Sequence, residues 1–190
     1  MPQPLRTFIA VKINPDEALL KLRQEILDKL YGESVKWVGT KNMHLTLKFL
    51  GNTATHQIEE VNNALQEIAY LYSPFAFKLK GLGFFKSNGM PRVLFVKPED
   101  DQILHQMADE VDKRLDGIGF IRETRPFSSH LTLARIKWLK NKMNFYQAVE
   151  KYDDIFIQMV SVQEIIFYES ILNSTGSEYI PLKKIQLINK

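Results

Sequence analysis

The tetrapeptide His-Leu-Thr-Leu occurs twice in this chain, at residues 44–47 and at residues 130–133. Side chains of a β-strand alternate between two faces, so each copy in extended form puts His and Thr on one face and both Leu on the other. The Leu faces suit a hydrophobic core. The His/Thr faces have no apolar reason to exist, so we expect both to line a cleft.

A single His-x-Thr strand would be weak evidence, because a lone strand histidine is more often a satisfied or solvent-exposed residue. Here two of the four histidines of the chain fall in the repeat. Paired imidazoles near neutral pH are versatile acid–base catalysts. We therefore interpret the two strands as one functional pair.

The composition is that of an ordinary soluble globular protein, with 45% hydrophobic and 25% charged residues. No run approaches the roughly 18 apolar residues that span a bilayer, and residues 1–6 lack the apolar core of a signal peptide, so we expect a cytoplasmic protein without membrane contact. The absence of cysteine excludes disulfides, thiolate nucleophiles and Cys-ligated zinc. A net charge of +3 tolerates a polyanionic ligand but is not the broad basic footprint of duplex binders.

Hydrophobic periodicity divides the chain into alternating strands and helices. Helices are predicted from an Asn14 cap to Gly32, over residues 55–72, from Ile103 to Leu115, and over residues 141–152. Residues 81–91 read as a turn-rich connection. Strands are predicted at residues 5–13, 35–38, 43–50, 75–80, 92–96, 129–136, 155–168 and 179–187.

Both halves of the chain repeat the order strand, helix, motif strand, helix, strand, and no linker rich in Pro, Gly or Ser separates them. We therefore predict an α+β fold in which residues 1–190 form a single bilobal domain. Each of the two pseudo-symmetric lobes would be an antiparallel-rich sheet with outer helices. One His-x-Thr-x strand from each lobe would face a central cleft.

Such a pair of strands suits displacement at phosphorus. One neutral imidazole can take a proton from water, and one imidazolium can give a proton to a leaving oxygen. Two threonine hydroxyls can hydrogen-bond the oxygens of an anion held between them. In-line displacement needs the attacking and leaving oxygens on opposite sides. The pair therefore indicates hydrolysis or transfer at a phosphodiester, with no metal and no other cofactor. Because the motifs are identical, this argument does not tell the acid from the base.

Two other hydrolase chemistries find no support in the sequence. A catalytic zinc usually has three protein ligands, and the remaining histidines, His56 and His105, have no partner at ligand spacing. A serine hydrolase would need a Gly-x-Ser-x-Gly elbow, which is absent.

From Arg6 to Leu187 the chain resembles the two-histidine phosphoesterases, specifically the RNA 2′,3′-cyclic phosphodiesterases, also called 2′-5′ RNA ligases. The resemblance rests on Trp37-Val38 followed by residues 42–51, on residues 91–95, on residues 127–135, and on Glu169-Ser170 with Gly176 and Tyr179. One departure is Ser129, where many relatives carry proline; proline there would only stiffen the entry to the strand.

The resemblance implies roles for the motif residues. His44 would be the proton donor to the leaving ribose oxygen, and His130 the proton acceptor that activates water. Thr46 and Thr132 would bind the phosphate. The expected substrate is an RNA with a 2′,3′-cyclic phosphate end or a small cyclic nucleotide, handled by a monomer, and the product is a 2′-phosphomonoester. Reversible 2′-5′ RNA ligation is a further implied activity. The alternative is a module that binds a nucleotide or RNA end without turnover.

Three further residues are candidates for the site. Strict alternation puts Arg135 on the Leu face, unless a bulge or the strand end turns it toward the anion; a bidentate phosphate contact would suit it. Arg92 opens a strand that the resemblance places near the phosphate. Phe127, just before the second motif, could stack a base or pack in the core.

Overall fold

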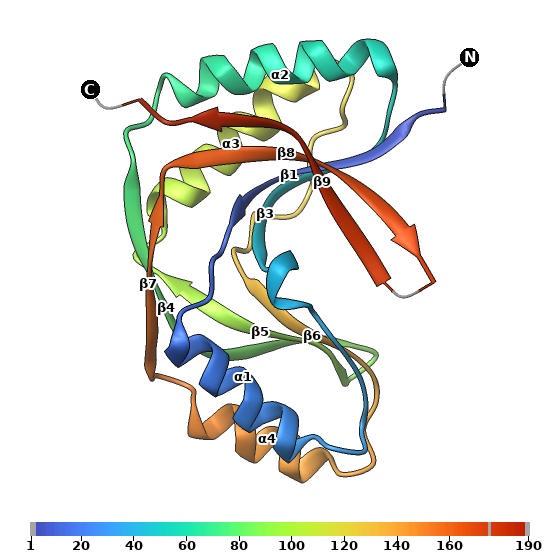
Figure 1. Cartoon of the computed structure of the whole chain (residues 1–190), viewed down its shortest axis with the longest axis vertical. Helices are drawn as coiled ribbons and strands as arrows, with labels where there is room; N and C mark the ends of the chain where they lie inside the picture. Colours follow the sequence, from blue (N-terminus) through green and yellow to red (C-terminus); the bar gives the residue numbers. More distant parts are fainter. Residues whose placement is uncertain (1–2, 175, 189–190) are drawn as a thin grey trace.

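The structure, a computed structural model, describes residues 3–174 and 176–188. It contains two antiparallel sheets, each covered by two helices (Figure 1). The first sheet has the order β3-β1-β8-β9 and packs against α2 and α3. Its elements are β1 (Leu5–Lys12), β3 (His44–Thr53), β8 (Glu164–Asn173), β9 (Gly176–Gln186), α2 (Thr55–Ala69) and α3 (Gln102–Asp116).

The second sheet has the order β2-β6-β5-β4-β7 and packs against α1 and α4. Its elements are β2 (Ser34–Trp37), β4 (Phe75–Ser87), β5 (Met90–Glu99), β6 (Leu131–Trp138), β7 (Phe156–Val162), α1 (Glu17–Lys29) and α4 (Lys142–Lys151). A short 3₁₀ turn, Thr40–Asn42, leads from β2 into β3. Among the described residues, no helix has the length and hydrophobicity needed to cross a membrane.

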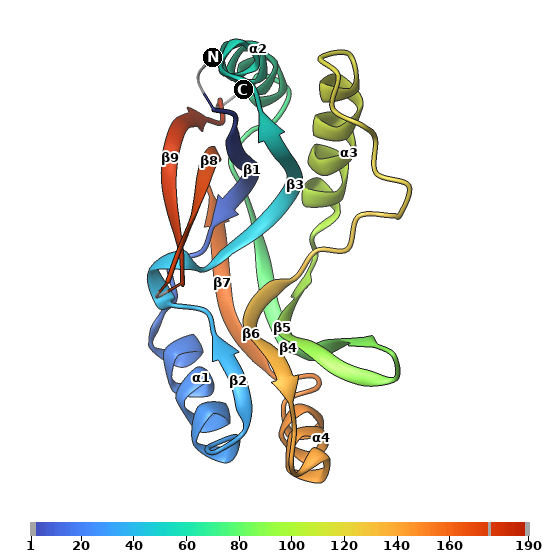
Figure 2. The same cartoon turned by 90° about the vertical axis from the view of Figure 1, so that its right-hand side faces the viewer.

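The predicted α+β class with one motif strand in each sheet is confirmed, but the two lobes are not the two halves of the sequence. The first sheet combines β1 and β3 with the C-terminal β8 and β9, because β8 pairs antiparallel to β1. The short β2 crosses over to pair with β6 in the second sheet. The chain therefore passes between the lobes several times (Figure 2).

Side-chain alternation along β1 shows how one strand separates the core from the site. Ile9 and Val11 belong to the main hydrophobic core, which draws residues from both sheets and all four helices. Phe8 and Ala10 point to the other face, where they form a small cluster with residues of β8. Burying each aliphatic side chain stabilises the fold by roughly 1.5–3 kcal/mol. The sheet is thus fixed from behind, while on the front face the small cluster leaves Phe8 at the edge of a pocket.

The start of the first helix differs from the prediction. Asp16, rather than Asn14, caps α1, since its Oδ1 accepts a hydrogen bond from the Leu19 backbone N–H at 2.9 Å. Asn14 and Asp16 are both held by the buried Gln158, whose amide bonds the carbonyl of the first and the N–H of the second. This long-range contact keeps residues 14–16 extended, so the helix begins two residues later than the Asn-Pro pattern indicates.

Two other predictions about strands were wrong. Residues 81–91 are not a connection: β4 and β5 run through them as a hairpin that turns at Asn88-Gly89, where both residues have positive φ. Asn-Gly is the usual sequence of such two-residue turns. Gly81 and Gly83 lie within β4, where a glycine allows a close contact. A Cβ added at Gly83 would lie 2.5 Å from the Phe95 ring, so this position has no room for a side chain. Residues 155–168 form parts of two strands, β7 and β8, instead of one.

Candidate active site

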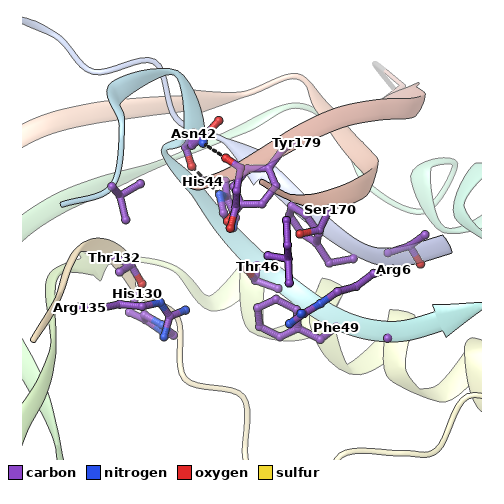
Figure 3. Close-up of a pocket in the computed structure, with 16 residues that line it drawn as sticks. Arg6, Asn42, His44, Thr46, Phe49, His130, Thr132, Arg135, Ser170 and Tyr179 are labelled. Atoms are coloured by element: carbon purple, nitrogen blue, oxygen red, sulfur yellow. Dashed lines mark hydrogen bonds between the residues drawn. The ribbon is translucent and has the colours of Figure 1, made fainter. Parts of the chain in front are cut away.

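The two motif strands face one pocket from opposite sheets. His44 is the first residue of β3, and His130 directly precedes β6; the two strands contact each other across the boundary between the sheets. The pocket has a volume of about 470 Å³, and His44, Thr46, His130 and Thr132 all line it (Figure 3). The structure thus brings together the four residues of the duplicated motif.

A β-bulge decides the direction of Arg135. In the pairing of β5 with β6, Thr132 lies opposite Phe95 and Ala134 lies opposite Leu94, which leaves Leu133 as an extra residue. Leu133 and Ala134 are consequently both buried, and Arg135 returns to the face of Thr132. Arg135 therefore lines the pocket, as the bulge alternative requires, instead of following the Leu face.

The first motif strand carries a bulge at the equivalent place. Thr46 lies opposite Ala10 and Lys48 lies opposite Ile9, so Leu47 is the extra residue. Leu47 and Lys48 are both buried, and Phe49 turns to the pocket face with 59% of its surface exposed. Phe49 in one motif therefore occupies the position of Arg135 in the other, and this substitution breaks the symmetry of the site.

Backbone carbonyls select the same tautomer for both histidines. The Nδ1 atom of His44 lies 2.7 Å from the carbonyl oxygen of Asn42 (Figure 3), and that of His130 lies 2.8 Å from the carbonyl oxygen of Ser128. A carbonyl can only accept, so each Nδ1 carries a hydrogen and donates it. In the neutral rings Nε2 is left as the nitrogen that can exchange a proton with a ligand.

Aromatic rings enclose His44. The centroid of its ring lies 5.0 Å from that of Phe8 and 5.1 Å from that of Tyr179, which meets it edge-on. This burial lowers the pKa of His44 below the usual 6.5, the Asn42 carbonyl opposes the shift, and the positive charges of His130 and Arg135 add to it.

His130 has a matching but more open setting. Its ring packs edge-on against Phe85 at 4.9 Å and lies 5.5 Å from Phe95. Burial lowers the pKa of His130 as well, the Ser128 carbonyl opposes the shift, and the charge of Arg135 adds to it. In both rings, therefore, burial and the charge of Arg135 disfavour the protonated form.

The polar lining of the pocket suits an anion. Arg6 and Arg135 both line it, and no aspartate or glutamate does. Within residues 3–174 and 176–188, neither guanidinium has a hydrogen bond or ion pair. The same residues contain no group of three His, Asp or Glu side chains that could hold a metal ion. The free cations and the two imidazoles are thus available to phosphate oxygens.

Comparison with known proteins identifies the family. A family model described as LigT like Phosphoesterase matches residues 11–95, which include the first motif. An RNA 2′,3′-cyclic phosphodiesterase of Thermotoga maritima is 34% identical over 184 residues, which are 96% of this chain and 95% of that protein. A protein of the same name from Methanocaldococcus jannaschii is 30% identical over 182 residues, or 95% of this chain and 99% of that one.

This chain belongs to the LigT-like phosphoesterase family. The predicted family and enzyme class are confirmed. Solved structures share the fold: a crystal structure of a Thermus thermophilus protein has a TM-score of 0.77 at 25% identity and covers 96% of this chain and 98% of its own. The crystal structure of Escherichia coli LigT complexed with 3′-AMP has a TM-score of 0.76 at 24% identity and covers 98% and 99%.

Two of the predicted site residues of this phosphoesterase lie outside the pocket. Val93 pairs with Arg135, so Arg92 projects from the opposite face of the sheet, where its guanidinium donates to the Lys137 carbonyl. Phe127 is half-buried against the core and faces a second, adjoining groove. The structure therefore does not bring Arg92 to the anion, and it places Phe127 beside the site.

Sequence reasoning missed several residues that line the pocket of this phosphoesterase. Arg6 and Phe49 belong to strands whose pairing turns them inward, and Asn42 fixes the β8–β9 hairpin by donating from Nδ2 to the Ser177 carbonyl at 2.8 Å. Tyr179 comes from that hairpin, far from His44 in sequence. Asn42, Phe49 and Tyr179 fall in segments that carry the family resemblance, but nothing in the sequence assigned them to the site. The one signal for Arg6, a basic residue at a strand start, is too common to select it.

Proposed function

We propose that this phosphoesterase hydrolyses the 2′,3′-cyclic phosphodiester at the end of an RNA or of a small cyclic nucleotide and yields a 2′-phosphomonoester. One observation carries the proposal: two histidines of the same tautomer offer Nε2 to one pocket that also holds two threonine hydroxyls and two arginines without a partner among the described residues. The names of the curated relatives support the choice of a 2′,3′-cyclic substrate.

The reaction follows from the two free Nε2 atoms. Nε2 of His130 takes a proton from water, and the water oxygen forms a bond to phosphorus. The bond from phosphorus to the 3′ oxygen breaks on the opposite side, and that oxygen receives the proton carried by Nε2 of His44. Thr46, Thr132 and Arg135 hydrogen-bond the phosphate oxygens as charge develops on them. The phosphate remains on the 2′ oxygen.

The shape of the pocket supports His44 as the acid. The apolar and hairpin residues of the lining gather around His44, whereas His130 is accompanied by Thr132 and Arg135 (Figure 3). A ribose and base need that apolar room, so the leaving ribose oxygen would face His44 and the attacking water would face His130. The identical motifs alone do not make this distinction.

Substrate binding would also favour protonation of the acid, with the proton taken from solvent. Burial and the charge of Arg135 hold the pKa of both histidines below the usual value in the free enzyme. A phosphate bound to Arg135 would offset that charge and favour the imidazolium form of a neighbouring histidine. The acid would therefore form together with the complex.

The direct test is turnover of adenosine 2′,3′-cyclic monophosphate in the presence of EDTA. We expect hydrolysis that EDTA does not affect, and chromatography should identify the product as the 2′-phosphate. Binding without turnover would instead identify a module that holds nucleotides or RNA ends, and loss of activity with EDTA would contradict the metal-free mechanism. A 5′-hydroxyl in place of the water would form the new bond to phosphorus while the bond to the 3′ oxygen breaks as before, and the product would be a 2′-5′ phosphodiester. Ligation of RNA through a 2′-5′ bond therefore belongs to the same proposal.

A further inference from the structure

A second groove opens beside the active pocket and is larger, at about 930 Å³. It shares Thr46, Phe49 and His130 with the pocket, so the two form one continuous depression. Residues 122–128 form one wall, and Phe85 and Lys86 of β4 form another. Figure 2 shows the segment that leads to β6 and the tip of the β4–β5 hairpin projecting on the same side of the molecule.

A buried ion pair fixes the wall made by residues 122–128. Lys48 is 3% exposed, its Nζ forms an ion pair with Asp112 of α3, and it donates to the Ile121 carbonyl at 2.9 Å. The backbone N–H of Glu123 donates to the same carboxylate at 3.1 Å. This segment has no regular secondary structure, yet these contacts hold it against β3, so the groove is preformed.

Aromatic rings and cations both line the groove. Phe49 is largely exposed, and Phe127 is half-buried with its ring edge-on to His105 at 5.1 Å between centroids. Lys86 and Arg125 are exposed, and neither has a carboxylate partner within the described part of the chain. Lys86 lies only over the Phe84 ring, at 5.5 Å from its centroid.

The carboxylates of the groove are mostly neutralised by its other cations. Asp112 pairs with Lys48 and with Arg122, and Asp109 lies 3.7 Å from Arg122. The side chain of Glu123 is the remaining acidic group of the lining. Lys86 and Arg125 are therefore free to meet a ligand, one on each wall.

We propose that this groove binds the single-stranded RNA that precedes the terminal cyclic phosphate, with bases stacked on Phe127 and Phe49 and phosphates on Arg125 and Lys86. The proposal rests on the function proposed above, which places the terminal nucleotide in the active pocket. Exposed aromatic rings combined with cations are the usual means of holding single strands without sequence preference. The RNA would pass over Phe49, which lines both cavities. The groove is larger than the pocket proposed to take one nucleotide, so its size suits further nucleotides.

The test compares adenosine 2′,3′-cyclic monophosphate with a hexanucleotide that ends in the same cyclic adenosine phosphate. We expect the wild-type enzyme to turn over the hexanucleotide with a kcat/KM at least about tenfold higher, the scale of one or two added stacking contacts. Binding of the corresponding 2′-phosphorylated hexanucleotide, followed by fluorescence anisotropy, should weaken with salt.

The variant Lys86→Gln/Arg125→Gln should lose about tenfold in kcat/KM for the hexanucleotide and leave mononucleotide turnover within about twofold. Its plot of log affinity against log salt should flatten by about 1.4, since each phosphate contact on a single strand contributes about 0.7. The matched control Lys183→Gln/Lys184→Gln removes the same charge from β9, at the other edge of the sheet from β3. It should leave kcat/KM unchanged for both substrates.

The results that would overturn the RNA groove differ from the result that would refute the proposed function. Equal kcat/KM for the two substrates in the wild type, or an equal loss for both in the groove variant, would overturn the RNA groove while mononucleotide turnover preserves the proposed function. Competition by an acidic peptide as strong as that by the RNA would also overturn it and indicate a protein partner. Failure of the wild type on both substrates would refute the proposed function itself.

Discussion

Replacing Arg135 by Gln tests the consequence of the bulge in β6. In the structure this guanidinium lines the pocket without a carboxylate partner among the described residues, so its hydrogen bonds are available to a phosphate. A hydrogen bond to a charged group contributes about 1.5–3 kcal/mol. Arg135 is exposed before substrate binds, so solvent screening favours the lower end. We expect kcat/KM to fall about 10- to 30-fold, since about 1.4 kcal/mol corresponds to a factor of ten.

The same substitution should move the pH profile in a defined direction. The charge of Arg135 helps to lower the pKa of both histidines, so its removal lets both pKa values rise toward 6.5, although burial still holds them below it. The profile of kcat/KM should be bell-shaped, and both limbs should shift to higher pH in the variant. Because the histidines are coupled, each limb belongs to the pair.

Initial rates with adenosine 2′,3′-cyclic monophosphate across this pH range provide the assay, and NMR titration of the imidazole protons checks the free enzyme. Arg92→Gln is the matched control, because Arg92 lies on the neighbouring strand but projects from the other face. It should alter neither rate nor profile. A normal rate for Arg135→Gln, limbs shifted to lower pH, or an equal loss in Arg92→Gln would refute the reasoning.

Three other expectations concern the histidines and the buried lysine. His44→Gln and His130→Gln should each lower kcat by about 10²–10⁴; a near-normal rate in either would remove that residue from catalysis. Lys48→Met leaves the Asp112 carboxylate without its buried partner, so urea denaturation should show a loss of about 3 kcal/mol in unfolding free energy, which Lys48→Met/Asp112→Leu should largely restore. An unchanged single variant would contradict this. Because burial lowers the pKa of both histidines, the unfolded chain binds more protons just below pH 6.5, and stability should fall as the pH drops below about 6.5. Replacing both histidines by Gln should flatten this dependence, and an undiminished slope would exclude them as its source.

Local pattern was sufficient for the elements that carry the motif. Alternation of polar and apolar residues depends only on neighbours in sequence, so it predicted that His44 and Thr46 share a face, as do His130 and Thr132. Helical periodicity likewise located α2, α3 and α4. The sequence also contains the Asn88-Gly89 signal for a hairpin turn. The hairpin was not predicted because Gly81 and Gly83 were interpreted as part of a loop, whereas in this fold they allow close packing within a strand.

Strand register could not be predicted from the sequence, because it depends on pairing with a partner strand. The bulges at Leu47 and Leu133 arise from pairing with β1 and β5, and they turn Phe49 and Arg135 into the pocket. The family resemblance led us to expect Arg92 near the phosphate, but the register of β5 with β6 puts Val93, and not Arg92, on the face of Arg135. One residue of offset exchanges the two faces of a strand, so proximity in sequence does not decide which arginine meets the anion.

The sequence by itself determined the family, through the duplicated motif and the segments around it, and also the paired strands and the chemistry that two imidazoles and two hydroxyls can perform. Tertiary structure decided how the surroundings of the two identical tetrapeptides differ, because bulges and distant contacts determine which neighbouring side chains reach each histidine. The hairpin with Tyr179 encloses His44 from a distant part of the chain, and a bulge gives His130 its arginine neighbour. The difference between proposed acid and proposed base is therefore set by long-range packing, which acts on residues that the sequence presents as equivalent.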